Sequence, residues 1–291
     1  MSVETCLPSD DGTSGAVPNM SSAPYRDILV EISEVSHITI NRPERLNALA
    51  MTRTDQELSH ALEAIEQSEQ VRVVILTGSG SRAFCAGWDL EVIGEVNLLE
   101  LEKLVRGNLA LFLKIWNLRC PVIAAINGYA LGAGASLALA CDLAIAGEAA
   151  KLGEPEIRHG ALSPFPVLPF FTAAKPLHAF YYFGDPIGAD EMLRLGLVNK
   201  VVPDAELGRA ARAYAERLAK VPSDFVQMTK RSLRASYDIL GLSNAMRQHA
   251  LTDTLAIGSK APDQQRLLDI LAKQGMRAFL EARDGPFRSP T

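Results

Sequence analysis

The sequence predicts an α/β protein in which a core of alternating strands and helices is followed by a region of helices alone. Short β-branched apolar runs alternate with segments of helical spacing up to about residue 203. From about residue 204 onward only helical spacing occurs. The composition, 48% hydrophobic and 22% charged over 291 residues, is typical of a globular chain long enough to bury a sizeable core. These observations indicate an α/β core with a helical appendage.

Composition excludes several classes of protein. The sequence contains no run of about 18 apolar residues, so no membrane-spanning helix is expected. The start of the chain lacks the basic and apolar regions of a secretory signal. The net charge of −5, without a long basic stretch, argues against a nucleic-acid surface. An anionic substrate would therefore need locally concentrated positive potential. The cysteines form no C-x-x-C pair, so we expect a cytoplasmic protein without a zinc site or disulfides; they are Cys6, Cys85, Cys120 and Cys141.

The first elements follow from hydrophobic periodicity. Residues 1–24 are rich in Ser, Gly, Pro and Thr, and we expect a disordered leader. Alternating apolar residues from residue 28 to residue 40 predict two strands joined by a turn. Residues 52–66 and 98–116 have helical spacing, and between them the apolar run 71–76 ends in a glycine-rich turn, as a buried strand does.

The second half of the core repeats this alternation. Residues 121–126 and 142–146 read as buried strands on either side of a small-residue helix over 135–140. A short helix after Ala189 leads to a last strand that Pro203 closes. Only helical patterns follow, over 207–218, 225–240 and two more segments before the tail.

The first segment that could carry chemistry is residues 83–90, just past the end of the strand predicted for 71–76. Ligands of open α/β sheets bind at such strand ends. Gly87 allows close approach of the backbone, so the N–H of Trp88 could point into a pocket. A packing turn with a buried aromatic is the alternative. Cys85 has no histidine within this segment to activate it and reads as a small buried hydrophobe.

The second segment is residues 127–136, in which Gly132 and Gly134 open a helix after a buried strand. The unpaired N–H groups at a helix start can stabilise an anion. The spacing also resembles a dinucleotide-binding fingerprint. Leu137 occupies the third glycine position, however, and no strand-end acid follows, so that interpretation is discarded.

The third segment is residues 153–160, where Glu154, Glu156, Arg158 and His159 cluster in a turn-like stretch. A carboxyl group held against apolar neighbours has a raised pKa and can shuttle protons. A solvated charged loop is the alternative.

Taken together in this order, the segments resemble the enoyl-CoA hydratase/isomerase (crotonase) family. The resemblance covers nearly everything from about residue 25 onward. The matching motifs are Asn41-Arg42-Pro43 with Leu46-Asn47-Ala48-Leu49, residues 84–90, residues 121–128, Gly132-Ala133-Gly134, Cys141-Asp142, Pro155-Glu156, residues 196–198 with 201–203, and the tail segment 275–283.

The resemblance implies a crotonase-like core of repeated ββα units over residues 25–203 that binds an acyl-CoA thioester. It implies that residues 204–291 form a C-terminal α-helical region used in oligomerisation, giving a homotrimer or a hexamer made of two trimers. No metal or redox cofactor is expected, because CoA is part of the substrate.

By the same resemblance, the N–H groups of Trp88 and Ala133 hold the thioester oxygen of an enolate, and Glu156 is the acid/base. The family usually has Gly where this chain has Ala133, which keeps the backbone N–H. The positions expected to contact the substrate are Arg45 (near the CoA phosphates), Ala86, Gly87, Asp89, Gly132 and Ser136.

Hydratases of the family use a second glutamate at the position of Ser136. A serine cannot act as a carboxylate base at neutral pH. This substitution places two-glutamate hydration in question and leaves double-bond isomerisation by Glu156, unless another acid (Glu154, Asp89 or Glu91) enters the pocket. The bulky stretch 161–171, with Phe165, Phe170 and Phe171, predicts a reshaped acyl pocket.

Other classes of function remain open at this point. Ser136 and His159 have the order of a nucleophile and base in a Clp-like serine hydrolase, although no orienting Asp is evident. A CoA-binding subunit without catalysis is the other alternative.

Overall fold

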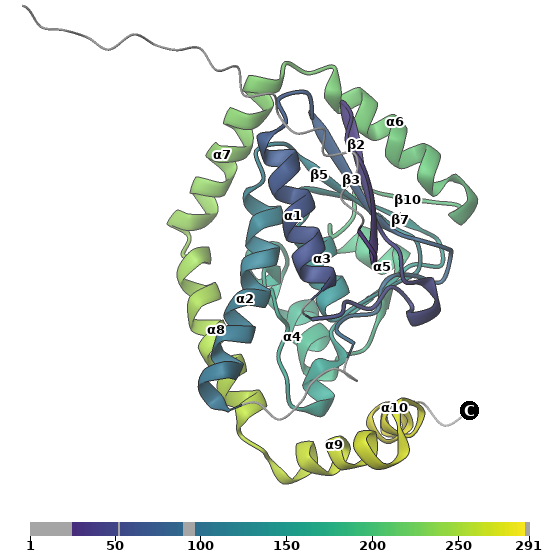
Figure 1. The fold of residues 1–291 in the computed structure, drawn as a ribbon, viewed down its shortest axis with the longest axis vertical. Coiled ribbons are helices and arrows are strands. Elements are labelled where there is room, and N and C mark those ends of the chain that lie inside the picture. Colours follow the sequence, from purple (N-terminus) through teal and green to yellow (C-terminus); the bar gives the residue numbers. More distant parts are fainter. Residues whose placement is uncertain (1–24, 52, 90–96, 289–291) are drawn as a thin grey trace, which may run out of the picture.

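The computed structural model describes residues 25–51, 53–89 and 97–288 (Figure 1). The leader predicted for residues 1–24, the start of the helix predicted from residue 52, and Glu91 lie outside these residues. Over the described residues the prediction of an α/β protein with a helical C-terminal region is confirmed. None of the described helices combines the length and the hydrophobicity that a membrane-spanning helix needs.

The larger sheet contains the strands that hydrophobic periodicity predicted. Its first two strands are antiparallel, with Ile28 opposite Ile40, and every other pairing is parallel. A parallel sheet is covered on both faces, which explains the continuous apolar runs. The strand order is β1 (Ile28–Glu31), β2 (Val35–Ile40), β3 (Val73–Gly78), β5 (Val122–Ile126), β7 (Leu143–Gly147) and β10 (Lys200–Val202).

Hydrophobic periodicity did not reveal a second, smaller sheet. Three of its strands each follow a strand of the larger sheet directly, so that β3 leads to β4, β5 to β6 and β7 to β8. This is the repeated ββ unit that the family resemblance implied. Strands of two or three residues are too short to show a hydrophobic period. They are β4 (Ala83–Cys85), β6 (Tyr129–Leu131), β8 (Lys151–Gly153) and β9 (Ile187–Gly188).

Helices cover the larger sheet from both sides (Figure 1). On one side lie α1 (Thr54–Gln67), α2 (Leu98–Asn117) and α3 (Ala133–Ala140), which pack with Val74 and Leu76 of β3 in the main core. On the other side, α6 (Leu207–Ala219) packs against Val73 and Ile75. The first helix of the predicted helical region therefore completes the core. Helix α3 begins two residues before the predicted start at 135.

The last four helices, α7 to α10, lie beside and below the core (Figure 1). In Figure 1, α7 and α8 run beside α2, while α9 and α10 lie together at the bottom and pack against the 3-10 turn Pro155–His159. The two further helices predicted before the tail are present, and the tail is itself helical. The bounds are α4 Ala174–Phe183, α5 Ala189–Arg194, α7 Ser223–Ile239, α8 Leu242–Gly258, α9 Pro262–Gln274 and α10 Met276–Asp284.

Candidate active site

Two loop segments that are far apart in the sequence pair as short extended strands. The N–H of Leu49 donates to the Gly87 carbonyl over 2.8 Å, and the N–H of Asp89 donates to the Leu49 carbonyl over 2.8 Å. Successive N–H groups of an extended chain point in opposite directions. The N–H of Trp88 therefore points away from Leu49, and it has no acceptor among the residues that the structure describes.

Asn47 holds this pair of loops in place. It is 1% exposed and lies in a left-handed backbone conformation (φ 56°). Its side-chain Nδ2 donates to the carbonyls of Ala83 (2.7 Å) and Ser79 (3.0 Å), and its Oδ1 accepts from the N–H of Arg42 (3.0 Å). The Leu-Asn-Ala-Leu motif thus has a structural role, positioning the segment that carries Trp88.

The start of α3 lies directly beside this segment. A Cβ on Gly87 would lie 3.6 Å from the backbone nitrogen of Ala133. Ala133 is the first residue of α3, and its N–H likewise has no acceptor within the described part of the chain. Two unpaired amides, from Trp88 and Ala133, thus come from neighbouring segments, the second at the positive end of a helix.

The carboxyl group of Glu156 lies against this helix start. A Cβ on Gly132 would fall 1.5 Å from Glu156 Oε1 and 3.1 Å from Oε2, so any larger residue would displace this carboxyl group. Gly132 also has φ +55°, which glycine adopts without strain. Burial raises the pKa of Glu156 to about 7, and the Arg283 guanidinium opposes that rise. The acid/base expected from the sequence therefore lies beside one of the two unpaired amides.

A second carboxyl group is buried in the same place. Glu154 is 2% exposed, and its Oε1 accepts hydrogen bonds from Ser163 Oγ (2.9 Å) and Ser136 Oγ (3.3 Å). Burial and the neighbouring Glu156 raise the pKa of Glu154 well above the usual value. Sequence reasoning named Glu154 only as one of three acids that could enter the pocket, and it missed Ser163, which no motif marks.

The structure does not pair Ser136 with His159. The Ser136 hydroxyl donates to Glu154, and over the described residues no hydrogen bond joins it to His159. The ring of His159 packs against Phe279 at 5.7 Å, and burial together with Arg283 lowers its pKa to about 4. Burial likewise raises the pKa of the Cys85 thiol to about 12. Ser136 and His159 therefore do not form a nucleophile–base pair, and Cys85 is not a reactive thiolate.

The other residues predicted to contact substrate lie around these groups. Asp89 is 9% exposed, and its Oδ2 is ion-paired with Arg42 Nη2 at 3.1 Å. The N–H of Ala86 donates to the Leu46 carbonyl over 3.1 Å. Arg45 is exposed at the end of the 3-10 turn Pro43–Arg45. Their contact with a substrate stays a prediction.

An aromatic row begins at the candidate site. The Trp88 ring meets Phe112 edge to face at 6.4 Å, and Phe112 packs against Phe165 at 5.9 Å. Phe165 is fully buried and also contacts Trp116. At least one bulky side chain of the stretch 161–171 therefore fills space behind Trp88.

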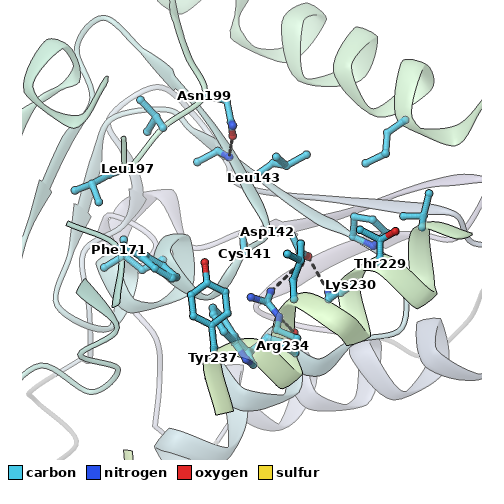
Figure 2. A pocket seen from close by; sticks show the side chains of 18 of the residues that line it. Cys141, Asp142, Leu143, Phe171, Leu197, Asn199, Thr229, Lys230, Arg234 and Tyr237 are labelled. Carbon is cyan, nitrogen blue, oxygen red and sulfur yellow. Dashed lines mark hydrogen bonds and ion pairs between the residues drawn. The ribbon is translucent and has the colours of Figure 1, made fainter. Parts of the chain in front are cut away.

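A cavity of about 720 Å³ lies elsewhere, beside α7 (Figure 2). None of Trp88, Ala133 and Glu156 lines it. At its wall Asp142 accepts from Lys230 Nζ and Arg234 Nη2, each at 2.7 Å, as Figure 2 shows. The Cys141-Asp142 motif thus ties α7 to the core. In the part of the chain described, no three His, Cys, Asp or Glu side chains are grouped as metal ligands.

Comparisons with known proteins agree with this geometry. A family model described as enoyl-CoA hydratase/isomerase matches residues 31–290. The short-chain-enoyl-CoA hydratase of Clostridium acetobutylicum is 37% identical, over 71% of this chain and 80% of that protein. The crotonyl-CoA hydratase of Syntrophomonas wolfei is 34% identical, over 91% and 99%. An enoyl-CoA hydratase/isomerase structure from Xanthobacter autotrophicus Py2 has a TM-score of 0.87 and 32% identity, covering 91% of this chain and 100% of that one.

Proposed function

Because the chain belongs to the enoyl-CoA hydratase/isomerase family, we propose that it acts on an enoyl-CoA thioester through an enolate. In this proposal the thioester oxygen accepts hydrogen bonds from the N–H groups of Trp88 and Ala133. One observation carries it: the Glu156 carboxyl group lies against Gly132, next to two amides that lack an acceptor among the described residues.

The amides act on the charge that develops during the reaction. When a nucleophile adds at C3, or a proton leaves the acyl chain, negative charge moves onto the thioester oxygen. Donors already in place stabilise that charge without reorganising, and removing one such donor typically costs about 3–4 kcal/mol. Since both donors are backbone groups, the change from the usual Gly to Ala133 leaves them unaltered.

Glu156 moves the protons in this proposal. A group whose pKa lies near the working pH can both accept and donate a proton, and burial raises the pKa of Glu156 to about 7. Its carboxyl group also lies close to the proposed oxyanion site, so a proton can be exchanged with a carbon next to the activated thioester.

Two reactions fit this machinery. Relatives named short-chain-enoyl-CoA and crotonyl-CoA hydratase support hydration of a short 2-enoyl-CoA. The Ser136 hydroxyl, at the position of the second glutamate of family hydratases, instead favours double-bond isomerisation by Glu156 alone. Hydration is the proposal, and isomerisation is the second candidate.

The test is turnover of 2-enoyl-CoA and 3-enoyl-CoA substrates in deuterated water, followed by mass spectrometry. Added water marks hydration, and deuterium exchange without added water marks isomerisation. Glu156→Gln is expected to lower kcat by about 10²–10⁴-fold. Glu148→Gln, on an exposed side chain, is the matched control and should match the wild type. Wild-type rates in Glu156→Gln would remove Glu156 from the mechanism.

The proposal also covers how CoA is held and how copies of the protein assemble. CoA enters and leaves as part of the substrate, with Arg45 near its phosphates. The helical region, which exposes Leu240, Leu251 and Leu255, joins copies into a homotrimer or hexamer. Light scattering on the purified protein would contradict this if it gave the mass of a single 31.5 kDa chain.

A further inference from the structure

Two glutamates enter the candidate site from the same short segment, on either side of Pro155. Glu154 precedes the 3-10 turn Pro155–His159 and Glu156 lies within it. Glu154 is buried, whereas Glu156 is partly accessible and its carboxyl group touches Gly132. Glu156 is therefore the member of the pair that meets a substrate, and Glu154 lies within its hydrogen-bond reach.

If both carboxyl groups were ionised, each would have a buried oxygen without a hydrogen-bond donor. Oε1 of Glu154 is satisfied by Ser136 and Ser163. Oε2 of Glu154 and Oε2 of Glu156 are both buried and have no donor among the described residues. Two carboxylates cannot donate to each other, but a carboxylic acid can donate to a carboxylate. One proton held by the pair therefore satisfies both.

The charges around the pair also favour a single negative charge. Facing it are Arg283 of α10, Asp253 of α8, Tyr181 of α4 and Cys85 of β4. Arg283 is the cation of this set, and its Nε and Nη2 are bound by Asp284 at 2.9 Å each. Two carboxyl groups within hydrogen-bond reach of each other do not both ionise at neutral pH without a cation to compensate their charge.

We propose that Glu154 is the second carboxyl group of a proton-sharing pair with Glu156, and that this pair replaces the glutamate missing at Ser136. The inference rests on the proposed enoyl-CoA function. It relocates the second acid from helix α3 to the loop before Pro155, where the Ser136 hydroxyl orients it. Glu154 acts through Glu156 and is a positioning residue.

The pair begins hydration with one proton. The ionised Glu156 takes a proton from water as the water oxygen bonds to C3, and the π electrons move onto the thioester oxygen. The pair, now holding two protons, returns one from Glu156 to C2 as the thioester carbonyl forms again. The hydrogen bond from Glu154 stabilises ionised Glu156 and so favours this return. The pair ends with one proton, as it began.

The first test needs no substrate. The full-length protein with glutamate ¹³C-labelled at Cδ is titrated by NMR, and Glu154→Gln and Glu156→Gln assign the two signals. We expect coupled titration, in which one carboxyl group of the pair stays protonated at pH 7. Independent ionisation of both near the ordinary value of about 4.3 would overturn the pair. An inactive wild type would overturn the proposed function instead, so the two failures are distinguishable.

The second test is the pH–rate profile of Glu154→Gln with the enoyl-CoA that the wild type turns over fastest. The pH–rate profile of the wild type should be bell-shaped, because only the singly protonated pair is active. The amide introduced by Glu154→Gln cannot ionise, so the alkaline limb should disappear, with kcat about 10–100-fold lower and little change in KM. A bell with both limbs in place would mean that Glu154 has a structural role only.

A compensating variant tests whether the second carboxyl group can be moved back to α3. Combining Ser136→Glu with Glu154→Gln puts the second carboxyl group on α3, where family hydratases have it. We expect the kcat of the double variant to be at least about tenfold higher than that of Glu154→Gln, and the alkaline limb of the pH–rate profile to return. Ser232→Glu combined with Glu154→Gln, which adds the carboxyl group at an exposed position of α7 instead, is the matched control and should show no recovery. A folded double variant without recovery would contradict the relocation.

Discussion

Gly132 and Glu156 are in such close contact that a Cβ atom on Gly132 would lie 1.5 Å from Glu156 Oε1. Gly132 immediately precedes Ala133, whose N–H has no acceptor among the described residues and is one of the two proposed oxyanion donors. The contact therefore links the proposed oxyanion site to the proposed acid/base through a single glycine, and it explains why these two segments must meet closely for the site to form.

Gly132→Ala should separate these two groups. The added methyl group cannot occupy the carboxyl position, and alanine is strained at φ +55°. Displacing a reacting group by about 1 Å typically costs about 10²-fold in rate, and we expect a loss in kcat of at least that size. Gly208→Ala, on an exposed position of α6 with open space around it, is the control and should be fully active. Normal kcat in Gly132→Ala would argue against the contact.

Phe165→Leu should widen the range of acyl groups. Phe165 is fully buried behind Phe112, which contacts the Trp88 ring. Removing the ring frees volume at a cost of roughly 1–3 kcal/mol of stability. We expect kcat/KM for octenoyl-CoA relative to crotonyl-CoA to rise about tenfold. Phe225→Leu, at a side chain 65% exposed on α7, is the control. An unchanged ratio would place Phe165 outside the acyl pocket.

Asp142→Ala should destabilise the fold without touching the candidate site. Asp142 accepts from Lys230, Arg234 and the N–H of Val122. Removing it leaves Lys230 and Arg234 without this carboxylate and with the backbone carbonyls of Cys120 and Trp116 as acceptors. Breaking such a buried ion pair typically costs about 3–5 kcal/mol. Urea unfolding should show this loss. Asp269→Ala, which removes an exposed i,i+4 ion pair with Lys273, is the control and should change the free energy of unfolding by less than about 0.5 kcal/mol. An equal loss of stability in both variants would refute the role of Asp142.

Asp253→Asn should change how stability depends on pH. Burial raises the pKa of Asp253 to about 6, against the hydrogen bond from the Leu162 N–H. The folded state therefore holds this proton more tightly than the unfolded chain, and stability is lost as pH rises from about 4 to about 6. The amide should remove that slope and add roughly 2–3 kcal/mol at pH 8.

Denaturation midpoints of Asp253→Asn measured from pH 4 to pH 8 check this expectation. Glu216→Gln, at an exposed position of α6, serves as the control and should follow the wild-type curve. The interpretation fails if the wild type and Asp253→Asn curves run parallel over this interval.

Much of the fold could be predicted because it is encoded locally. The central strands β3 and β5 are apolar runs buried on both faces, and the outer strand β2 alternates between buried and accessible residues. Helices such as α2 carry a helical period that is visible without neighbours. Periodicity could not reveal the smaller sheet, because strands as short as Ile187–Gly188 show no period. That α6 belongs to the core was equally hidden, since an amphipathic helix does not show which surface it covers.

The candidate site divides in the same way. The chain order of its motifs predicted the family, which the comparisons confirm. It also indicated the two candidate amides and Glu156, which stay predictions, because each lies in a short contiguous segment. The partnership of Glu154 with Ser136 and Ser163, and the pairing of Asp89 with Arg42, depend on contacts between segments distant in sequence. Hydrogen bonds and burial of that kind exist only after the chain has packed. The sequence alone therefore determined which acids are available, while the packed structure determined that Glu154 is buried against Glu156.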